Sequence, residues 1–124
     1  MEEQTWTIGE LARAFGITTR AIRFYEAEGL LHPERNGQTR IYRPRDRVRL
    51  KLILRGKRLG FSLSESRELI DMYSPDADNR DQLRALLDKI DDRRRQLEQQ
   101  RRDIDAMEAE LDEVAQRCRE ALDD

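Results

Sequence analysis

Apolar residues in the first part of the chain recur at helical spacing, and each run is bounded by residues that start or stop helices. Thr7 and Glu10 have the spacing of a capping box, which predicts a first helix over residues 7–15. Thr18 can cap a second helix, and Gly29 can end it because glycine readily adopts the left-handed conformation that follows a helix. Two short helices joined by a tight link predict a helix-turn-helix.

The pattern then changes to one typical of a small hairpin. The pair Asn36-Gly37 favours a tight turn, and Arg40-Ile41-Tyr42 alternates as a short strand does. A proline opens a third helix, predicted over residues 44–59, and a second capping box at Ser62 and Glu65 begins a fourth. Residues 1–74 are therefore predicted to form one mainly helical head that carries a hairpin.

A proline-containing stretch separates this head from a long helix. Pro75 cannot continue the fourth helix, so residues 75–78 are predicted to be a hinge. Asn79 and Gln82 have the spacing of a further capped helix start, and no glycine or proline follows them. A dimerisation helix is therefore predicted over residues 79–124.

This long helix carries apolar or soft residues at intervals of seven, namely Leu83, Ile90, Leu97, Ile104, Leu111 and Cys118. At about 1.5 Å per residue the helix is roughly 60 Å long, which is more than the small head can cover. We therefore expect the stripe to pair with the same helix of a second subunit as a coiled coil. The stripe alone does not distinguish parallel from antiparallel pairing. An isolated charged helix held by internal ion pairs is the alternative.

Composition supports the division into a head and a helix. Of the 124 residues 40% are charged, which is too polar for one globular body. Residues 1–60 carry 13 Lys or Arg against 7 Asp or Glu, a balance of +6, whereas residues 61–124 carry 11 against 19, a balance of −8. The basic head favours double-stranded DNA as a partner, and a charged surface that contacts only water is the simpler alternative.

The second predicted helix supplies side chains suited to a major groove. Arg20 and Arg23 are three residues apart and share one face, with Thr19 and Tyr25 near its edges. Phe24 is expected among the apolar anchors on the other side. Arginine can bridge guanine edges or bind phosphates, whereas threonine and tyrosine suit phosphate oxygens.

The predicted hairpin adds further candidates for DNA contacts. Arg40, Tyr42 and Arg43 flank it and are expected to contact the DNA backbone beside the groove. Two competing interpretations stay open at this point. The helix arginines can pair with Glu26 or Glu28 on their own helix, and the Tyr42 ring can pack in the small core.

The sequence provides little for catalysis or metal binding. His32, the only histidine, precedes a proline in a turn and has no cluster of metal-ligand spacing around it. Cys118 is the only cysteine, so no disulfide can form within the chain and a reducing compartment is expected. No apolar run is long enough to cross a bilayer. We expect a cytoplasmic protein that is not an enzyme, has no cofactor or metal, and uses Cys118 as a soft core residue.

Several motifs in combination resemble the MerR family of bacterial transcription regulators. They are the run Ala21-Ile22-Arg23-Phe24-Tyr25-Glu26 with Gly29-Leu30 after it, the turn Asn36-Gly37 with Arg40-Ile41-Tyr42, and Leu59-Gly60-Phe61-Ser62-Leu63. The resemblance covers about residues 5–73. It implies a winged helix-turn-helix head and an antiparallel two-stranded coiled coil between two subunits. It also implies a near-palindromic promoter with an overlong spacer, which the regulator bends and untwists for RNA polymerase.

The same resemblance assigns roles to individual residues. Arg20 and Arg23 fall where recognition-helix contacts occur, Tyr25 where a phosphate contact occurs, and Arg40 and Tyr42 on the wing. The wing is one residue longer than the commoner form, and no effector pocket is expected because metal-sensing and drug-sensing relatives continue beyond the point where this chain stops. The wing and the residues after it look most like the branch that controls branched-chain amino acid and acyl-CoA breakdown genes.

Two other functions fit parts of the pattern. One is an adaptor whose coiled coil binds a protein partner, and the other is an architectural DNA binder without sequence preference. The arginine-bearing helix and the hairpin favour sequence-specific DNA binding over the adaptor.

Overall fold

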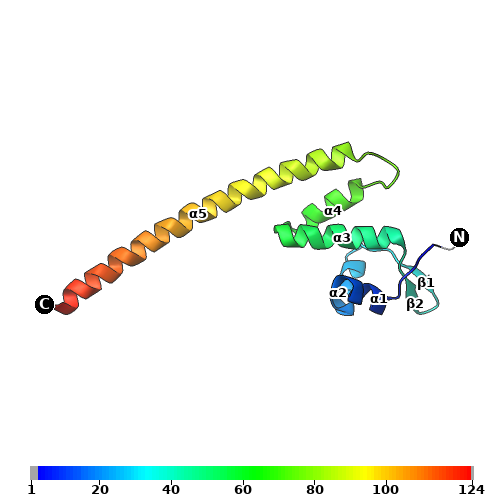
Figure 1. Cartoon of the computed structure of the whole chain (residues 1–124), viewed down its shortest axis with the longest axis horizontal. Helices are drawn as coiled ribbons and strands as arrows, with labels where there is room; N and C mark the ends of the chain where they lie inside the picture. The colour runs from blue at the N-terminus through cyan, green and yellow to red at the C-terminus, as the bar shows by residue number, and fades with distance from the viewer. Residues whose placement is uncertain (1–2, 124) are drawn as a thin grey trace. The chain divides into compact units, whose positions relative to one another are not determined.

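The computed structural model describes residues 3–123, which form a mainly helical chain in two compact units that divide between Gln82 and Leu83 (Figure 1). In chain order the elements are α1 (Ile8–Phe15), α2 (Thr19–Ala27), β1 (Glu34–Asn36), β2 (Thr39–Ile41), α3 (Pro44–Leu59), α4 (Leu63–Met72) and α5 (Arg80–Asp123). The predicted fold class is confirmed, with a helix-turn-helix, a two-stranded wing and a long C-terminal helix. Among residues 3–123, no helix combines the length and the apolar character that a membrane span requires.

The predicted caps of the helix-turn-helix are present. The Thr7 side chain accepts a hydrogen bond from the Glu10 amide at 3.1 Å, and the Thr7 amide donates to Glu10 Oε1 at 2.9 Å. The hydrogen bond from the Thr7 amide lowers the pKa of the Glu10 carboxyl. Thr18 Oγ1 caps α2 at the amide of Ala21, 3.1 Å away, and Gly16 ends α1 with a φ of 65°. Local capping thus sets the bounds of both helices.

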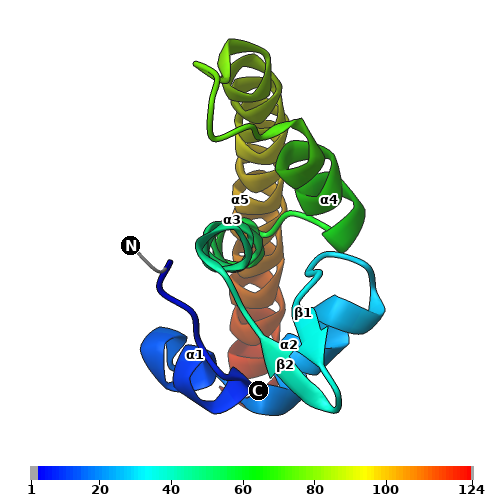
Figure 2. The same cartoon turned by 90° about the vertical axis from the view of Figure 1, so that its right-hand side faces the viewer.

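The predicted hairpin is also confirmed. β1 and β2 are antiparallel, with Glu34 opposite Ile41 and Asn36 opposite Thr39. Gly37 has a φ of 67° in the turn, a conformation that side chains other than glycine rarely adopt. Figure 2 shows these two strands as a small sheet beside α2. The hairpin therefore forms the wing of the head.

The core of the head joins all of its helices. Its fully or almost fully buried side chains are Leu11, Ile22, Leu30, Leu31, Tyr42, Leu50, Ile53 and Ile70. At one edge the Arg47 guanidinium lies over the rings of Trp6 and Phe15, at 5.2 and 5.4 Å from their centroids. These cation–π contacts connect α3 to α1 and to the segment before it.

The contact between α3 and α4 depends on a small residue. Gly56 is buried in α3 and faces Ser66, which is buried in α4. A Cβ atom added at Gly56 would overlap Ser66 Oγ, whereas it would lie 3.4 Å from Ser66 Cβ, near ordinary contact. Glycine therefore allows the two helices to approach closely.

We expect Gly56→Ala to lower the free energy of unfolding by about 1 to 2 kcal/mol, because the added methyl group overpacks this contact. In a Ser66→Ala background the same change is expected to be neutral or stabilising by up to about 1 kcal/mol, since alanine has the higher helix propensity. Urea denaturation of the four proteins measures both effects. An equal cost of Gly56→Ala in both backgrounds would show that Ser66 is not the limiting contact.

The start of α5 differs from the predicted asparagine cap. Asn79 has a φ of 60°, and its side-chain nitrogen Nδ2 donates to the backbone carbonyls of Ser74 at 2.8 Å and Ala77 at 3.0 Å. Asp78 Oδ1 instead accepts from the Arg80 amide at 3.2 Å. The prediction was wrong because the Asn79 side chain closes the preceding turn and cannot also cap the helix.

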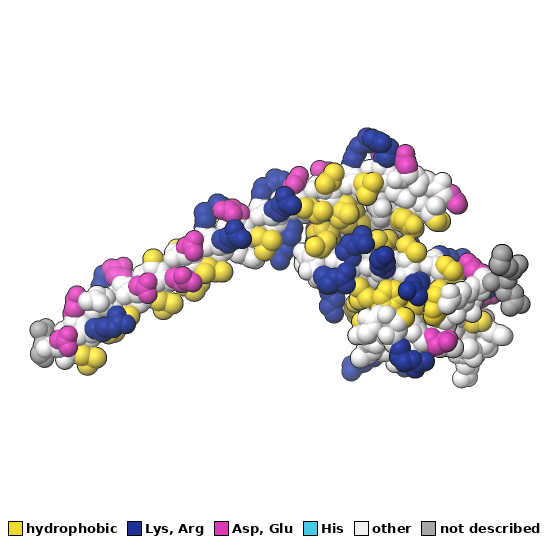
Figure 3. Space-filling model, in the orientation of Figure 1, with side chains coloured by type: hydrophobic (Ala, Val, Ile, Leu, Met, Phe, Trp, Pro, Cys, Tyr) yellow, Lys and Arg dark blue, Asp and Glu magenta, His cyan; other side chains and the backbone are white. Residues whose placement is uncertain are grey.

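The predicted stripe of α5 is largely exposed in the single chain. Figure 3 shows apolar side chains along one edge of this helix between charged ones. Leu97 is 45% exposed, and Leu83, Ile104, Leu111 and Cys118 are also exposed, while Ile90 is half-buried. Gln82 donates to the Leu69 carbonyl at 2.8 Å and so does not complete a capping box. A stripe of this length needs a partner to be covered.

Candidate nucleic-acid interface

α2 presents two exposed arginines while its other face is anchored in the core. Ile22 and Tyr25 are buried and lie three residues apart, so they share the inward face. Arg20 and Arg23 are exposed, and neither forms a hydrogen bond or an ion pair with any residue in the described range 3–123. The competing pairing with glutamates of the same helix is therefore absent. Both guanidinium groups are available to an external partner.

The aromatic residues of α2 exchange their predicted roles. Phe24, expected among the anchors, is 51% exposed, whereas Tyr25, expected at the edge of the outer face, is buried. Their rings meet edge to face, with centroids 5.6 Å apart. Tyr25 is buried because it follows Ile22 by three residues and therefore shares its face. Thr19 is half-buried in the first turn of the helix.

Glu26, at the end of α2, is the centre of an ion-pair cluster with the wing. Its Oε1 accepts from Arg35 Nη2 at 2.5 Å, and its Oε2 accepts from Arg40 Nε at 2.8 Å. The Tyr42 hydroxyl lies 3.5 Å from the same Oε2. Sequence reasoning treated Glu26 only as a partner of the helix arginines, and it could not find the cluster because the three wing residues follow it by 9 to 16 positions.

Tyr42 is a core residue rather than a DNA contact. It is 0% exposed, and its amide and carbonyl each form a 2.9 Å hydrogen bond with the backbone of Trp6. The predicted wing contact of Tyr42 was therefore wrong, and the competing core interpretation holds. Burial is the main cause that raises the pKa of Tyr42 to about 12, and the charge of Glu26 adds to it.

This raised pKa predicts a loss of stability in alkali. The neutral phenol stabilises the fold fully below the unfolded-state pKa of about 10, and this contribution disappears as the pH rises from about 10 to 12. A shift of this size corresponds to about 2 to 3 kcal/mol. Between about pH 9 and pH 12 we expect the free energy of unfolding to fall more in the wild type than in Tyr42→Phe, and the difference should be about 2 to 3 kcal/mol. Parallel pH profiles of the two proteins in urea denaturation would contradict this assignment.

Arg43 is held by two carboxylates at the junction of β2 and α3. Its Nε donates to Glu34 Oε2 at 2.7 Å, and its Nη1 donates to Glu3 Oε2 at 3.0 Å. The hydrogen bond to Glu34 is the main cause that raises the pKa of the guanidinium. The Arg43 amide also donates to the buried Asp46 at 2.9 Å, which caps α3. A DNA phosphate would have to compete with Glu34 and Glu3 for this arginine.

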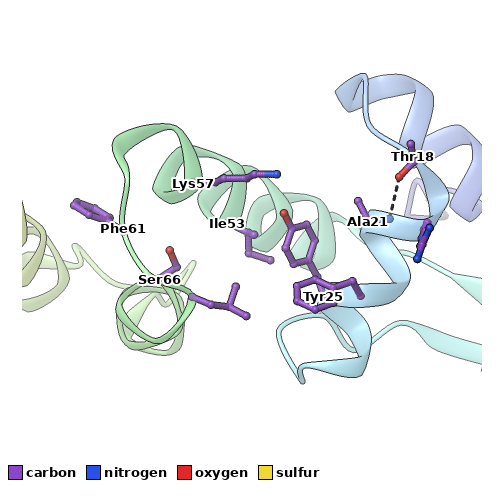
Figure 4. Close-up of a pocket in the computed structure, with 10 residues that line it drawn as sticks. Thr18, Ala21, Tyr25, Ile53, Lys57, Phe61 and Ser66 are labelled. Carbon is purple, nitrogen blue, oxygen red and sulfur yellow. Dashed lines mark hydrogen bonds between the residues drawn. The ribbon is translucent and has the colours of Figure 1, made fainter.

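A groove of about 550 Å³ lies beside α2, between this helix and the helices α3 and α4 (Figure 4). Ala21, Tyr25 and Ile53 belong to its apolar lining, and Arg20 and Lys57 are its two cationic side chains. Sequence reasoning did not single out Lys57, because only the packing of α3 against α2 brings it next to the recognition helix. It adds a positive charge beside the outward face of α2.

Residues 3–123 contain no group of three or more His, Cys, Asp or Glu side chains that could hold a metal ion. Cys118 is a free, exposed thiol on α5. The candidate site is therefore the cationic face made by α2 and the residues around it.

Known proteins similar to this chain are transcription regulators. The MerR HTH regulatory protein family matches residues 6–73, and the MerR DNA-binding family matches residues 47–114. The regulator HmrR of Rhizobium leguminosarum bv. viciae is 37% identical over 103 residues, which cover 79% of this chain and 80% of that protein. The regulator CueR of Escherichia coli O157:H7 is 31% identical over 114 residues, 90% of this chain and 82% of that protein.

Solved structures show the same relationship. A MerR family transcriptional regulator from Bacillus cereus has a TM-score of 0.68 and 28% sequence identity, over 89% of this chain and 79% of its own. HiNmlR, a MerR family regulator that lacks the sensor domain and was crystallised with promoter DNA, has a TM-score of 0.60 and 25% identity, over 82% of this chain and 80% of its own. The chain therefore belongs to the MerR family of helix-turn-helix regulators and is a DNA-binding transcription regulator of that type.

Proposed function

We propose that this regulator binds a near-palindromic promoter as a homodimer and that Arg20 and Arg23 read base edges in the major groove. The observation that carries the proposal is the outward face of α2, where both guanidinium groups are exposed and unpaired within the described residues. An arginine held by intramolecular carboxylates would have to lose those contacts before it bound a base. The free pair on α2 does not carry that cost.

The other contacts of the proposed interface are to phosphates. Thr19 and Lys57 flank the outer face of α2, and phosphate contacts fix the register of a protein on the duplex without reading sequence. Tyr25 is 5% exposed, so its proposed phosphate contact uses only the small accessible part of the residue. Arg40 and Arg43 are proposed to contact the backbone from the wing, in competition with their carboxylate partners.

The dimer is proposed to form through α5 in an antiparallel coiled coil, with residues 75–78 as the hinge. The exposed stripe from Leu83 to Cys118 supports it, because isolated helices do not keep a seven-residue apolar repeat for this length. Two heads joined by such a helix pair have a fixed separation. They would meet successive major grooves by bending or untwisting the DNA, at a cost of several kcal/mol that phosphate contacts offset.

We also propose, by resemblance to the family, that the distorted promoter is the one that RNA polymerase uses, so that the regulator acts in the cytoplasm. The assignment to the branch that controls branched-chain amino acid and acyl-CoA breakdown genes is a narrower proposal. Only the stretch from Asn36 to Arg49, with its run from Gln38 to Pro44, supports it. On this narrower proposal the effector is an acyl-CoA thioester.

Footprinting of the purified chain on its own upstream region tests the proposal. The expected result is one protected inverted repeat, and the protection should change on addition of acyl-CoA thioesters if the narrower proposal holds. Fluorescence anisotropy over a salt series separates the other functions. A protein-binding adaptor would bind DNA little at any salt concentration, and an architectural binder would bind operator and random duplex equally.

A further inference from the structure

Glu26 poses an electrostatic problem for a DNA-binding surface. It is a carboxylate on the same helix as Arg20 and Arg23, and a negative charge near phosphates normally weakens DNA binding. Its side chain is only 14% exposed, and its two oxygens are used by different partners, Oε1 by Arg35 and Oε2 by Arg40. The arrangement indicates that Glu26 has a structural role whose benefit exceeds the unfavourable effect of its charge on DNA binding.

The wing has few other ties to the helices. Each of its strands has three residues, and all three residues of β1 are exposed. A two-stranded hairpin of this size is marginally stable in water by itself. Apart from Tyr42, whose ring is buried in the core and whose backbone pairs with Trp6, and apart from the contacts of Arg43, the cluster at Glu26 is the side-chain link that the described residues show between the wing strands and the rest of the head.

We propose that Glu26 is a positioning residue that fixes the angle between the wing and the recognition helix, so that both meet the same duplex in register. The inference rests on the proposed function, in which α2 and the wing contact one DNA molecule. Arg40 is the half-buried arginine of the cluster, since its side chain is 25% exposed. Arg35 is 55% exposed, and it keeps part of its guanidinium open to a phosphate while Glu26 orients it.

The test compares three single substitutions. Glu26→Gln removes the charge and replaces one of the two acceptor oxygens with an amide nitrogen that only donates, so that Arg35 and Arg40 no longer have one oxygen each. Glu26→Asp keeps the charge but shortens the side chain by one methylene group, so that it reaches both arginines poorly. Glu28→Gln is the matched control, because Glu28 is an exposed carboxylate two residues further along whose side chain forms no interaction within residues 3–123. Anisotropy with operator and random duplex, each over a salt series, gives affinity and salt slope.

For Glu26→Gln, a positioning role predicts weaker operator binding, whereas a mere loss of negative charge predicts tighter operator binding. We expect operator affinity to fall about tenfold, while affinity for random duplex stays level or rises about twofold. The salt slope on random duplex should become steeper by about one, because Arg40 becomes available to a phosphate, whereas Arg35 is already partly open to one. Glu26→Asp is expected to lower operator affinity about threefold or more and to leave random binding unchanged. Glu28→Gln is expected to tighten binding to both duplexes by about twofold.

The inference fails if Glu26→Gln tightens operator binding as Glu28→Gln does, or if Glu26→Asp matches the wild type. Thermal unfolding shows whether each variant is folded at the assay temperature, and if Glu26→Gln is not, the result for Glu26→Asp decides. A wild type that does not distinguish operator from random duplex would instead contradict the proposed function, and with it the inference. These two failures are therefore distinguishable in one data set.

Discussion

Leu97→Glu is expected to separate the proposed dimer and to lower operator affinity by about a hundredfold or more. Leu97 is near the middle of the exposed stripe on α5, and a dimer would bury two copies of it, one from each subunit. Burial of one leucine is worth about 1.5 to 3 kcal/mol, so the loss of two amounts to about 3 to 6 kcal/mol before the cost of burying a carboxylate is added. The dissociation constant of the dimer should therefore rise at least about a hundredfold.

Loss of the dimer affects DNA binding through avidity, because two linked heads bind about 10² to 10⁴ times more tightly than one head with the same contacts. Sedimentation measures the dimer, and anisotropy with operator measures the binding. Gln99→Glu is the matched control, since it adds the same charge two residues away at a position outside the stripe. The coiled-coil assignment would be abandoned if Leu97→Glu sedimented as a dimer at micromolar concentration, or if wild type and variant were both monomers.

Arg23→Ala is expected to weaken operator binding by about 1 to 3 kcal/mol and to reduce discrimination between operator and random duplex. The physical reason is that a bidentate base contact contributes to both affinity and specificity, whereas a phosphate contact contributes to affinity alone. Arg23 forms no internal ion pair in the described part of the chain, so its removal leaves no carboxylate unpaired. The fold should be unaffected.

Arg119→Ala is the control for net charge, because Arg119 is an exposed arginine on α5 that lies outside the head. It is expected to change operator binding by less than about 0.5 kcal/mol. Equal losses of Arg23→Ala on operator and on random duplex would show that Arg23 touches only phosphate. A loss as small as that of Arg119→Ala would remove Arg23 from the interface.

The free and the paired arginines of the head explain how one basic surface can contain different roles. Arg20 and Arg23 are exposed without internal partners, whereas Arg35, Arg40 and Arg43 are held by carboxylates. The unpaired arginines can exchange bound water for a base edge, whereas the arginines held by carboxylates help to hold the wing in place. Counting positive charges along the chain would treat all five as equal.

Much of the fold followed from the sequence because the signals are local. The capping boxes at Thr7 and Ser62, the turn at Gly37 and the proline that opens α3 act within a few residues, and the structure confirms each of them. The exposed arginines of α2 were also predictable, since residues three apart on a helix share a face whatever surrounds them.

The tertiary structure alone decided which polar groups meet across the head. Asn79 is of a residue type that often caps helices, yet its side chain forms hydrogen bonds with the backbone of Ser74, five residues earlier, and closes that turn. Tyr42 lies in a run that alternates as an exposed strand does, yet its ring is buried in the core. Its backbone pairs with Trp6, and its hydroxyl donates to Glu26. Capping and helical periodicity depend on neighbours in the chain, and so the sequence determined the elements and the exposure of the two α2 arginines. Burial and ion pairing depend on residues brought together by folding, and so only the packed head determined the roles of Tyr42, Glu26 and Lys57.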